Sequence, residues 1–161
     1  MQQEKDICWY EYSIYYSMDK NFWEIKSLHE MTEKEWESLC DGCSMCCLEK
    51  IEYEDTGEVL YTCVACRHLD IVSCNCKEYK NRFISTNCKK ITAENIFDMK
   101  WLPDTCAYKI LTEGRKLEWW HPLISGDKNT IHDAGISISN IAISGKYIHP
   151  DDLESYVIKV N

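Results

Sequence analysis

The chain has 161 residues and a formal charge of −9, and it contains 11 cysteines but only 6 glycines and 3 prolines. This length fits a single domain, and the scarcity of Gly and Pro argues against long disordered segments. The acidic balance and the lack of clustered Lys and Arg exclude a chain that attracts nucleic acid by its net field, so we expect no nucleic-acid partner.

The first predicted element is an N-terminal appendage over residues 1–21, which precedes one domain over residues 22–161. The appendage begins with a charged stretch that no apolar segment follows, so no secretory signal peptide is expected. No run of the chain approaches the roughly 18 apolar residues of a membrane span. We therefore expect a cytoplasmic protein that has no membrane partner and whose thiols are kept reduced.

A helix is predicted over residues 30–39, directly before the first cluster of cysteines. Thr32 is a good N-cap residue, and Glu35 stands three positions later, as in a capping box. The apolar residues that are expected to form the buried stripe are Leu28, Met31, Trp36 and Leu39. Gly42 can adopt a positive φ, so the chain is expected to turn tightly just after this helix.

A β-hairpin is predicted over residues 51–63, where apolar and polar residues alternate around the turn Asp55-Thr56-Gly57. Residues 66–88 show a short and irregular pattern, and a loop is predicted over residues 119–127. Further helices are predicted at three places, which are residues 92–99, residues 103–114 and the segment that begins at Pro150. The expected fold is a small α+β domain with several helices, one hairpin and irregular, metal-stapled loops.

The strongest chemical signal is the run Cys40-Asp-Gly-Cys43-Ser-Met-Cys46-Cys47. Two residues between cysteines allow both sulfurs to reach one metal from a single turn, whose backbone N–H groups stabilise the thiolate charge. Three thiolates at this spacing can hold one metal ion or one face of an iron–sulfur cluster. Because the side chains of adjacent residues diverge, we expect Cys47 to serve a second metal or to bridge two metals.

Six more cysteines follow the run, namely Cys63, Cys66, Cys74, Cys76, Cys88 and Cys106. In a reducing compartment this density indicates metal or redox chemistry. The odd total and the adjacent pair also suit a disulfide framework poorly. Burial as small apolar residues would explain any single cysteine, but it would not produce the C-x2-C-x2-C-C spacing. Since a tetrahedral site takes four ligands, the available thiols suffice for two sites.

Several longer segments, which together span roughly residue 22 to the C-terminus, carry a resemblance to a known family. The main ones are Phe22-Trp23, Glu35-Trp36-Glu37-Ser38-Leu39-Cys40-Asp41-Gly42-Cys43, Cys46-Cys47-Leu48, Val64-Ala65-Cys66-Arg67, Cys74-Asn75-Cys76-Lys77-Glu78-Tyr79, Thr105-Cys106-Ala107-Tyr108, Trp119-Trp120-His121-Pro122-Leu123 and His132-Asp133-Ala134-Gly135-Ile136-Ser137. In these segments the chain resembles the YcgN-type UPF0260 proteins. They belong to the wider CxxCxxCC, or YkgJ-like, group of cysteine-cluster proteins, which are described as zinc- or iron-chelating.

The resemblance implies metal binding but no particular reaction. By match to the pattern of the family, the implied ligands are Cys40, Cys43, Cys46, Cys47, Cys66, Cys74, Cys76, Cys88 and Cys106. Two cysteines depart from the pattern. Cys63 stands where the family usually has another residue, and Cys8 lies in the additional N-terminal segment, so neither is expected to bind metal.

One other place could carry chemistry, the segment over residues 119–133. It contains His121, Asp127, His132 and Asp133, which could bind a metal with an open position or act as acid and base. No established zinc or triad spacing is present. The simpler interpretation, which we favour, is that His121 packs beside two tryptophans and that His132 caps a turn.

Three functions stay open on this evidence. The first is a metal-binding protein whose thiolates hold zinc, with two or more ions per chain, and organise a surface for a protein or small-molecule partner. The second is an iron–sulfur redox protein, although the ferredoxin-like x3-C-P continuation is missing after Cys46. The third is a metal-dependent enzyme that uses His121 and His132. The absence of a complete ferredoxin pattern favours zinc over iron or an iron–sulfur cluster.

Overall fold

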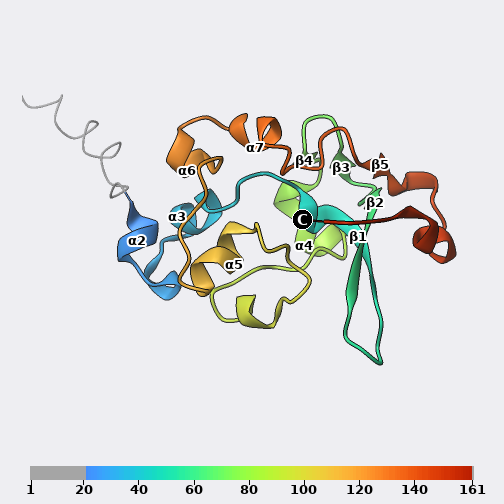
Figure 1. The fold of residues 1–161 in the computed structure, drawn as a ribbon, viewed down its shortest axis with the longest axis horizontal. Coiled ribbons are helices and arrows are strands. Elements are labelled where there is room, and N and C mark those ends of the chain that lie inside the picture. Colours follow the sequence, from blue (N-terminus) through green and yellow to red (C-terminus); the bar gives the residue numbers. More distant parts are fainter. Residues whose placement is uncertain (1–20, 161) are drawn as a thin grey trace, which may run out of the picture.

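Short helices and short strands alternate in the computed structural model, which describes residues 21–160 (Figure 1). The α-helices are α2 (Phe22–Ile25), α3 (Glu33–Ser38), α4 (Arg82–Ser85), α5 (Ala107–Thr112), α6 (Pro122–Ser125) and α7 (Thr130–Asp133). The 3-10 helices are η1 (Leu28–Glu30), η2 (Met45–Cys47), η3 (Tyr79–Asn81), η4 (Ile96–Asp98), η5 (Gly145–Tyr147) and η6 (Pro150–Tyr156). The strands are β1 (Leu48–Glu52), β2 (Val59–Ala65), β3 (Leu69–Asp70), β4 (Asn75–Cys76), β5 (Ile143–Ser144) and β6 (Val157–Ile158). The predicted α+β class is confirmed.

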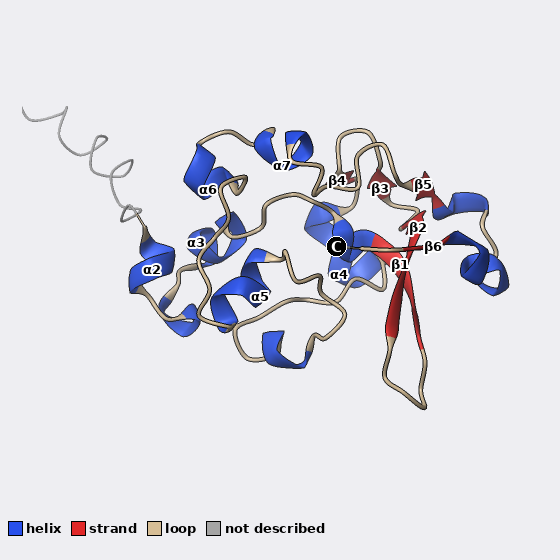
Figure 2. Cartoon of the chain, in the orientation of Figure 1, coloured by secondary structure: helices blue, strands red, loops and turns tan. Residues whose placement is uncertain are grey.

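The larger sheet is built around β2, which pairs with β1 as an antiparallel hairpin (Figure 2). Two short segments from the C-terminal part of the chain pair with successive stretches of β2. β6 lies antiparallel to it at Tyr61 and Thr62, and β5 lies parallel to it at Val64 and Ala65. A second, two-stranded sheet pairs β3 with β4. The C-terminal segments therefore hold the strand that leads directly into Cys66.

The predicted hairpin is confirmed, with strands that extend three residues earlier and two residues later than the expected 51–63. Its turn contains Gly57, whose φ is +68° and whose N–H donates to the carbonyl of Tyr53 at 2.7 Å. A glycine tolerates this left-handed conformation without steric cost. The local turn sequence was thus sufficient to predict the hairpin.

The helix expected over residues 30–39 begins later than predicted and spans Glu33–Ser38 as α3. Its predicted capping box is confirmed, because the Thr32 side chain accepts from the N–H of Glu35 and the Glu35 side chain accepts from that of Thr32. Residues 28–30 form the separate helix η1, which has its own capping box between Ser27 and Glu30. Two N-terminal caps in succession divide the predicted helix into two short ones.

Three further predictions of helices are corrected in length or type. Residues 92–99 contain only η4, because the Asn95 side chain accepts from the N–H of Thr92 and competes with helical bonding. The helix expected over 103–114 is α5, which begins after Cys106, a residue in extended conformation. The segment that begins at Pro150 forms the 3-10 helix η6 rather than an α-helix.

Two segments expected to be irregular contain regular structure. Residues 119–133 were expected to form a loop at their start, but they include α6 and α7. Pro122 occupies the first turn of α6, where its missing N–H is harmless. Residues 66–88 contain β3, β4, η3 and α4. The predicted appendage, with Cys8, lies outside the described residues except for residue 21.

Two clusters of buried side chains make most of the core. The sheet-side core consists of Cys43, Met45, Leu48, Ala65, Leu69, Cys74, Ile131 and Ile138. The helix-side core consists of Phe22, Leu39, Ile96, Met99, Leu102 and Tyr108, and the predicted stripe residues Leu28, Met31 and Trp36 pack against it. The chain passes from one core to the other between Leu39 and Cys43, so the cysteine run lies where they meet. Within residues 21–160, no helix has the length and apolar character needed to cross a bilayer.

Candidate metal centre

Most cysteines of the described residues gather on one cavity of about 1450 Å³, whose walls include members of both cores. Nine cysteines line it, and they are Cys40, Cys43, Cys46, Cys47, Cys66, Cys74, Cys76, Cys88 and Cys106. These are the nine that match the pattern of the family. Cys63 is not among the lining residues, although it is only three positions from Cys66. Proximity in the chain therefore does not by itself place a cysteine on this cavity.

The turn between α3 and β1 carries four of these thiols. Gly42 and Ser44 have left-handed backbones, with φ of +78° and +60°, which reverse the chain twice within a few residues. The N–H of Cys43 donates to Oδ1 of Asp41 at 2.9 Å. The Ser44 hydroxyl donates to the carbonyl of Cys74 at 2.8 Å and so ties this turn to the loop before β4. The turn is held in place from both sides.

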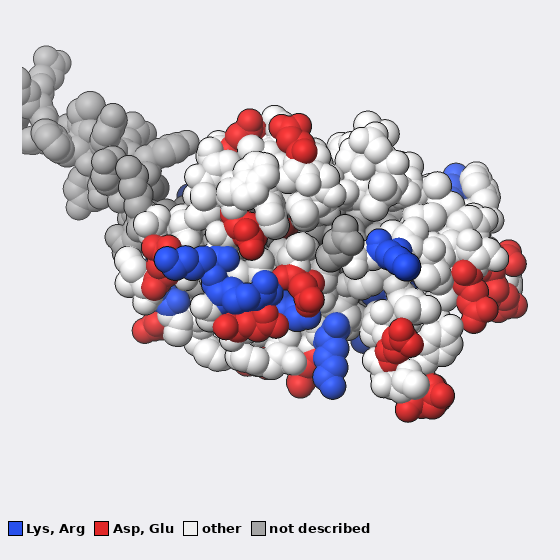
Figure 3. All heavy atoms as spheres, viewed as in Figure 1, with Lys and Arg blue, Asp and Glu red and all other residues white. Residues whose placement is uncertain are grey.

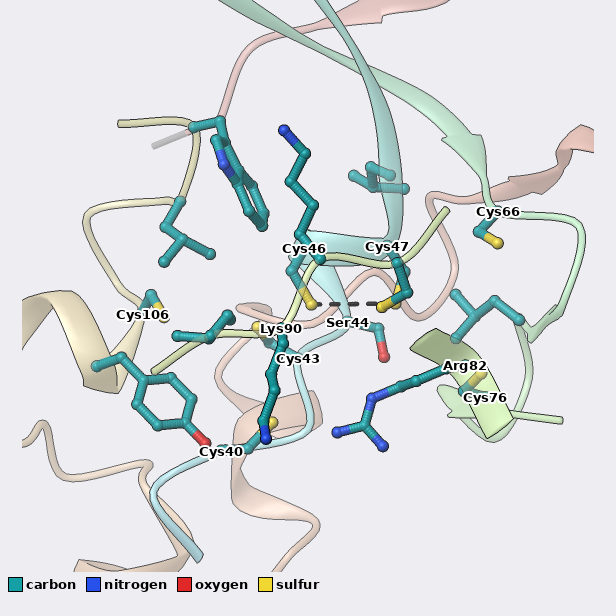
Figure 4. Close-up of a pocket in the computed structure, with 18 of the residues that line it drawn as sticks. Cys40, Cys43, Ser44, Cys46, Cys47, Cys66, Cys76, Arg82, Lys90 and Cys106 are labelled. Atoms are coloured by element: carbon teal, nitrogen blue, oxygen red, sulfur yellow. Dashed lines mark hydrogen bonds between the residues drawn. The ribbon is translucent and has the colours of Figure 1, made fainter. Parts of the chain in front are cut away.

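Cys46 and Cys47 lie side by side at the middle of the cavity, with their sulfurs 3.9 Å apart (Figure 4). The contact with Cys47 lowers the pKa of Cys46, and the charge of Lys50 adds to this effect. The pKa of Cys47 is raised, by its contact with Cys46 and by burial. Lys50 Nζ donates to three carbonyl oxygens at the base of this turn, those of Met45, Cys46 and Leu48. Burial lowers the pKa of Lys50, and the two cysteines oppose that shift.

One group of thiols surrounds the Cys46 sulfur and consists of Cys40, Cys43, Cys46 and Cys106. The charge of Cys46 contributes to the raised pKa of each of the other three. Burial is the largest cause in each case, and it raises the pKa of Cys40 to about 12 although solvent reaches this residue through the cavity. Burial also raises the pKa of Cys106 to about 11, while the backbone amides of Tyr108 and Lys109 partly oppose this.

A second group consists of Cys47, Cys66, Cys76 and Cys88. The charges of Cys88 and Cys66 are among the causes that raise the pKa of Cys47. The N–H of Cys66 donates to the carbonyl of Cys47 at 2.8 Å, and the N–H of Leu69 donates to that of Cys66 at 2.9 Å. Leu69 is in turn the β-bridge partner of Cys76. Burial raises the pKa of Cys88, and the charges of Cys46, Cys76 and Cys66 add to this in that order, so Cys88 is coupled to both sides of the central pair.

Figure 4 shows the labelled members of these two groups on opposite sides of the central pair. On one side of the pair lie Cys106, Cys43 and Cys40, and on the other lie Cys66 and Cys76. Cys74 belongs to neither group. It is buried, its φ is +54°, and after burial the largest cause of its raised pKa is the charge of Asp70 rather than that of another cysteine.

The donor set suits a thiophilic metal, but the sulfurs are not arranged as a formed site. All ten cysteines in the described residues are free thiols. Among residues 21–160, no three Cys, His, Asp or Glu side chains converge as they would around a bound ion. Soft thiolate ligands select zinc, copper(I) and iron–sulfur clusters. The chemistry of the donors therefore fits such a group, whereas coordination would require the sulfurs of each group to draw together.

Basic side chains also point into the cavity. Figure 4 shows Arg82 and Lys90 directed toward its interior. Arg82 stacks over the ring of Tyr79 at 3.7 Å, pairs with Glu37 at 3.7 Å and lowers the pKa of Cys88 in part. Arg82 therefore both forms an ion pair with Glu37 and acts on the thiol of Cys88.

The outer surface differs from the cavity. Over the part of the face where Figure 1 places α5, Lys and Arg lie directly beside Asp and Glu (Figure 3). Two of the ion pairs of this region join Lys109 to Asp104 and Arg115 to Glu113. Interleaved charges of this kind make no strong field of one sign.

The four other candidates, His121, Asp127, His132 and Asp133, do not line the cavity. His121 is buried and acts as the N-cap of α6, with Nδ1 accepting from the N–H of Leu123 and Nε2 2.9 Å from the carbonyl of Leu39. His132 Nδ1 lies 2.7 Å from the hydroxyl of Ser137. Each ring is thus engaged in hydrogen bonds with its own partners, and the Leu39 carbonyl that His121 contacts lies far away in the sequence.

Sequence reasoning missed three residues that shape the site, Asp41, Ser44 and Lys50. Asp41 and Ser44 occupy the x positions of the cysteine motif, where the spacing alone gives them no role. Lys50 looks like one of several charged residues on a strand with an exposed face. The one sequence signal that could have pointed to Asp41 is its position between Cys40 and Cys43, two cysteines at the spacing of metal ligands.

The fold and the cavity define a small, cysteine-rich α+β protein whose thiols are concentrated at one place. The chain is 52% identical over 141 residues to a UPF0260 protein of Rhizobium leguminosarum, covering 87% of this chain and 88% of the relative. It is 48% identical over 142 residues to one of Rhodopseudomonas palustris (87% and 84%) and 53% identical over 121 residues to one of Nitrobacter hamburgensis (74% and 71%).

The chain belongs to the UPF0260 family, as its sequence predicted. The names of these relatives state the family and no activity. A comparison with protein-family models gave no match. A comparison with solved structures gave none either.

Proposed function

We propose that this protein binds metal through two groups of thiolates, and that the metal is zinc, with two ions or more per chain. The observation that carries the proposal is the gathering of nine family-pattern cysteines on one cavity, with Cys63 left out of it. Free thiols buried only as small apolar residues would be distributed over the core. We place the protein in the cytoplasm, where such thiols stay reduced.

The division into two groups supports more than one ion per chain. Each group offers four thiols, the number of ligands that a tetrahedral zinc ion takes. One group would be Cys40, Cys43, Cys46 and Cys106, and the other would be Cys47, Cys66, Cys76 and Cys88. When bound, zinc would neutralise part of the thiolate charge and fix the loops that carry the ligands. The adjacent Cys46 and Cys47 would then serve different ions, in agreement with the divergence of neighbouring side chains.

An iron–sulfur cluster is the second candidate, and one observation favours it. Cys106 lies in the same group as the three cysteines of the C-x2-C-x2-C run, so a fourth, distant thiol is available as four-thiolate clusters require. Zinc remains our choice because the ferredoxin-like continuation is absent after Cys46. The third alternative, an enzyme that uses His121 and His132, gains no support from the cavity, since neither lines it.

Metal analysis of protein purified without oxygen tests the proposal directly. We expect two or more zinc ions per chain, no acid-labile sulfide and no colour. A brown preparation with iron and sulfide would favour the cluster instead. A preparation that stays free of metal, and that takes up neither zinc nor iron when these are supplied to the reduced protein, would contradict both candidates. Aerobic preparations are unsuitable because zinc replaces lost iron.

A matched pair of substitutions tests which cysteines are ligands. Cys66→Ser should remove a thiolate from the second group and lower the zinc content by about one ion per chain, because the remaining three thiols bind zinc less tightly. Cys63→Ser, three residues away and also half-buried, should leave the zinc content unchanged. Zinc lost through Cys63→Ser and kept in Cys66→Ser would show that the cavity does not mark the ligands.

A further inference from the structure

Asp41 has the one buried side-chain polar atom in the described residues that no hydrogen-bonding group satisfies. The residue is 7% exposed, and its Oδ2 has no partner among residues 21–160. Oδ1 is occupied by the N–H of Cys43 at 2.9 Å. Buried polar atoms in folded proteins are almost always paired, and a buried carboxylate without a partner is costly. Such an atom indicates that a group is missing from its surroundings.

The surroundings of Asp41 supply no cation to balance this carboxylate. No Lys, Arg or His in the described part of the chain forms an ion pair with it. Its charge acts instead on the thiols of the first group and on the ring of His121, whose pKa burial lowers. Asp41 lines the same cavity. Its Oδ1 accepts from the N–H of Cys43, which fixes the carboxylate inside the turn that carries Cys40 and Cys43. A cation bound among these donors would balance the carboxylate and give Oδ2 a partner.

We propose that Asp41 is an oxygen ligand of the metal held by Cys40, Cys43, Cys46 and Cys106, which it binds through its free Oδ2. This inference rests on the proposed metal binding and makes the two groups different. The first group has five donors for an ion that takes four, so with Asp41 bound one of its thiols is left free to exchange. The second group has four thiols and no buried carboxylate, and it makes a closed site. Exchange of metal or binding of a further ligand would therefore occur at the first group.

The substitution Asp41→Asn separates a ligand from a merely structural carboxylate. Asparagine keeps an oxygen to accept from the N–H of Cys43, and it removes the unbalanced charge. The metal-free variant is therefore expected to melt at the same temperature as the wild type or higher. The zinc-loaded variant is expected to bind zinc at least about tenfold more weakly at this site, since even an outer partner of a ligand is worth 10- to 100-fold. A structural role would lower the melting temperature in both states.

X-ray absorption at the zinc edge gives the second measurement. Wild-type protein loaded with zinc should show oxygen at about 2.0–2.2 Å besides sulfur at about 2.3 Å, and Asp41→Asn should lose the oxygen. The control is Asp70→Asn, since Asp70 Oδ1 also accepts an N–H two residues later, that of Val72, but Asp70 does not line the cavity. It should change neither result.

An all-sulfur shell in the wild type, an oxygen contribution that Asp41→Asn leaves intact, or a metal-free Asp41→Asn that does not fold would each overturn the assignment of Asp41. These results are distinct from failure of the proposed function itself, in which wild-type protein takes up no metal and its melting temperature does not respond to zinc.

Discussion

At the scale of the single residue, His121 connects the start of α6 to Leu39, the residue directly after α3. Both of its nitrogens lie within hydrogen-bonding distance of main-chain groups, of Leu123 and of Leu39. Burial lowers the pKa of this imidazole below 6.5, against the opposing effects of the Leu39 carbonyl and of Asp41. The ring is therefore held in its neutral form, as suits a residue that both accepts and donates.

This environment predicts how stability depends on pH. The unfolded chain takes up a proton on this histidine near pH 6.5, whereas the folded chain does so only at lower pH. The contribution of His121 to the free energy of unfolding is thus complete above pH 6.5 and is lost as the pH falls below it. Urea unfolding of the metal-free protein at pH 7.5 and 5.5 measures the loss, which should be smaller in His121→Gln.

His121→Gln should also be less stable at pH 7.5 by about 1–3 kcal/mol, because two main-chain groups lose a buried partner. The control is His149→Gln, since the His149 side chain is 69% exposed. This change should leave the wild-type pH dependence in place. An identical pH dependence in wild type and His121→Gln would show that another group is responsible.

At the scale of the element, the turn over residues 41–47 depends on Lys50. Its ammonium group donates to three carbonyl oxygens and lies 4.9 Å from the ring of Tyr61. Lys50→Met keeps much of the apolar stem but leaves these carbonyls without their donor. We expect a loss of about 1–3 kcal/mol in the free energy of unfolding, measured by urea denaturation of the metal-free protein.

The control for this change is Lys146→Met. Lys146 is exposed, and its ammonium group lies over the ring of Tyr147. The substitution should alter the free energy of unfolding by no more than about 0.5 kcal/mol, as is usual for surface positions. If both substitutions changed the free energy of unfolding equally, the three carbonyl oxygens would be shown to accept hydrogen bonds from water in place of Lys50.

Elements with local signals were predictable, and elements fixed by distant contacts were not. The capping box of Thr32 and Glu35 and the Gly57 turn each depend on residues within a few positions, and both were predicted from the sequence. The start of α5 was not, because Cys106 is held extended at the boundary of the cavity. The cysteine set was predictable through the family pattern. Its division into two groups was not, because Cys106 and Cys88 approach the run only in the folded chain.

At the scale of the whole molecule, the cavity lies where two separate cores meet. Metal bound there would join the helix-side core to the sheet-side core, and binding of this kind contributes to folding directly. With free zinc a thousandfold above its Kd, the stabilisation is about 4 kcal/mol. For a chain of this length that corresponds to a rise in melting temperature of roughly 8–16 °C.

Removal of metal by a chelator should therefore lower the melting temperature by this amount and increase amide exchange over residues 40–106. Calorimetry and hydrogen exchange, with metal content checked in each sample, make the measurement. Exchange in the β1–β2 turn at residues 54–57 should stay the same, because these residues do not line the cavity. An unchanged melting temperature after verified removal would contradict a role of metal in joining the cores.

The adjacency of Cys46 and Cys47 also limits how the length of this chain can vary among its relatives. A residue inserted into the turn of the β1–β2 hairpin is absorbed by a loop, at little entropic cost. A residue inserted between the two cysteines would add up to about 3.6 Å of chain between sulfurs that now lie 3.9 Å apart. Either group of thiols alone could adjust to the added residue. Both groups could not keep their ligands in place at once, because the inserted residue would move the two sulfurs apart. Insertions and deletions should therefore accumulate in the hairpin and be excluded from this one peptide bond.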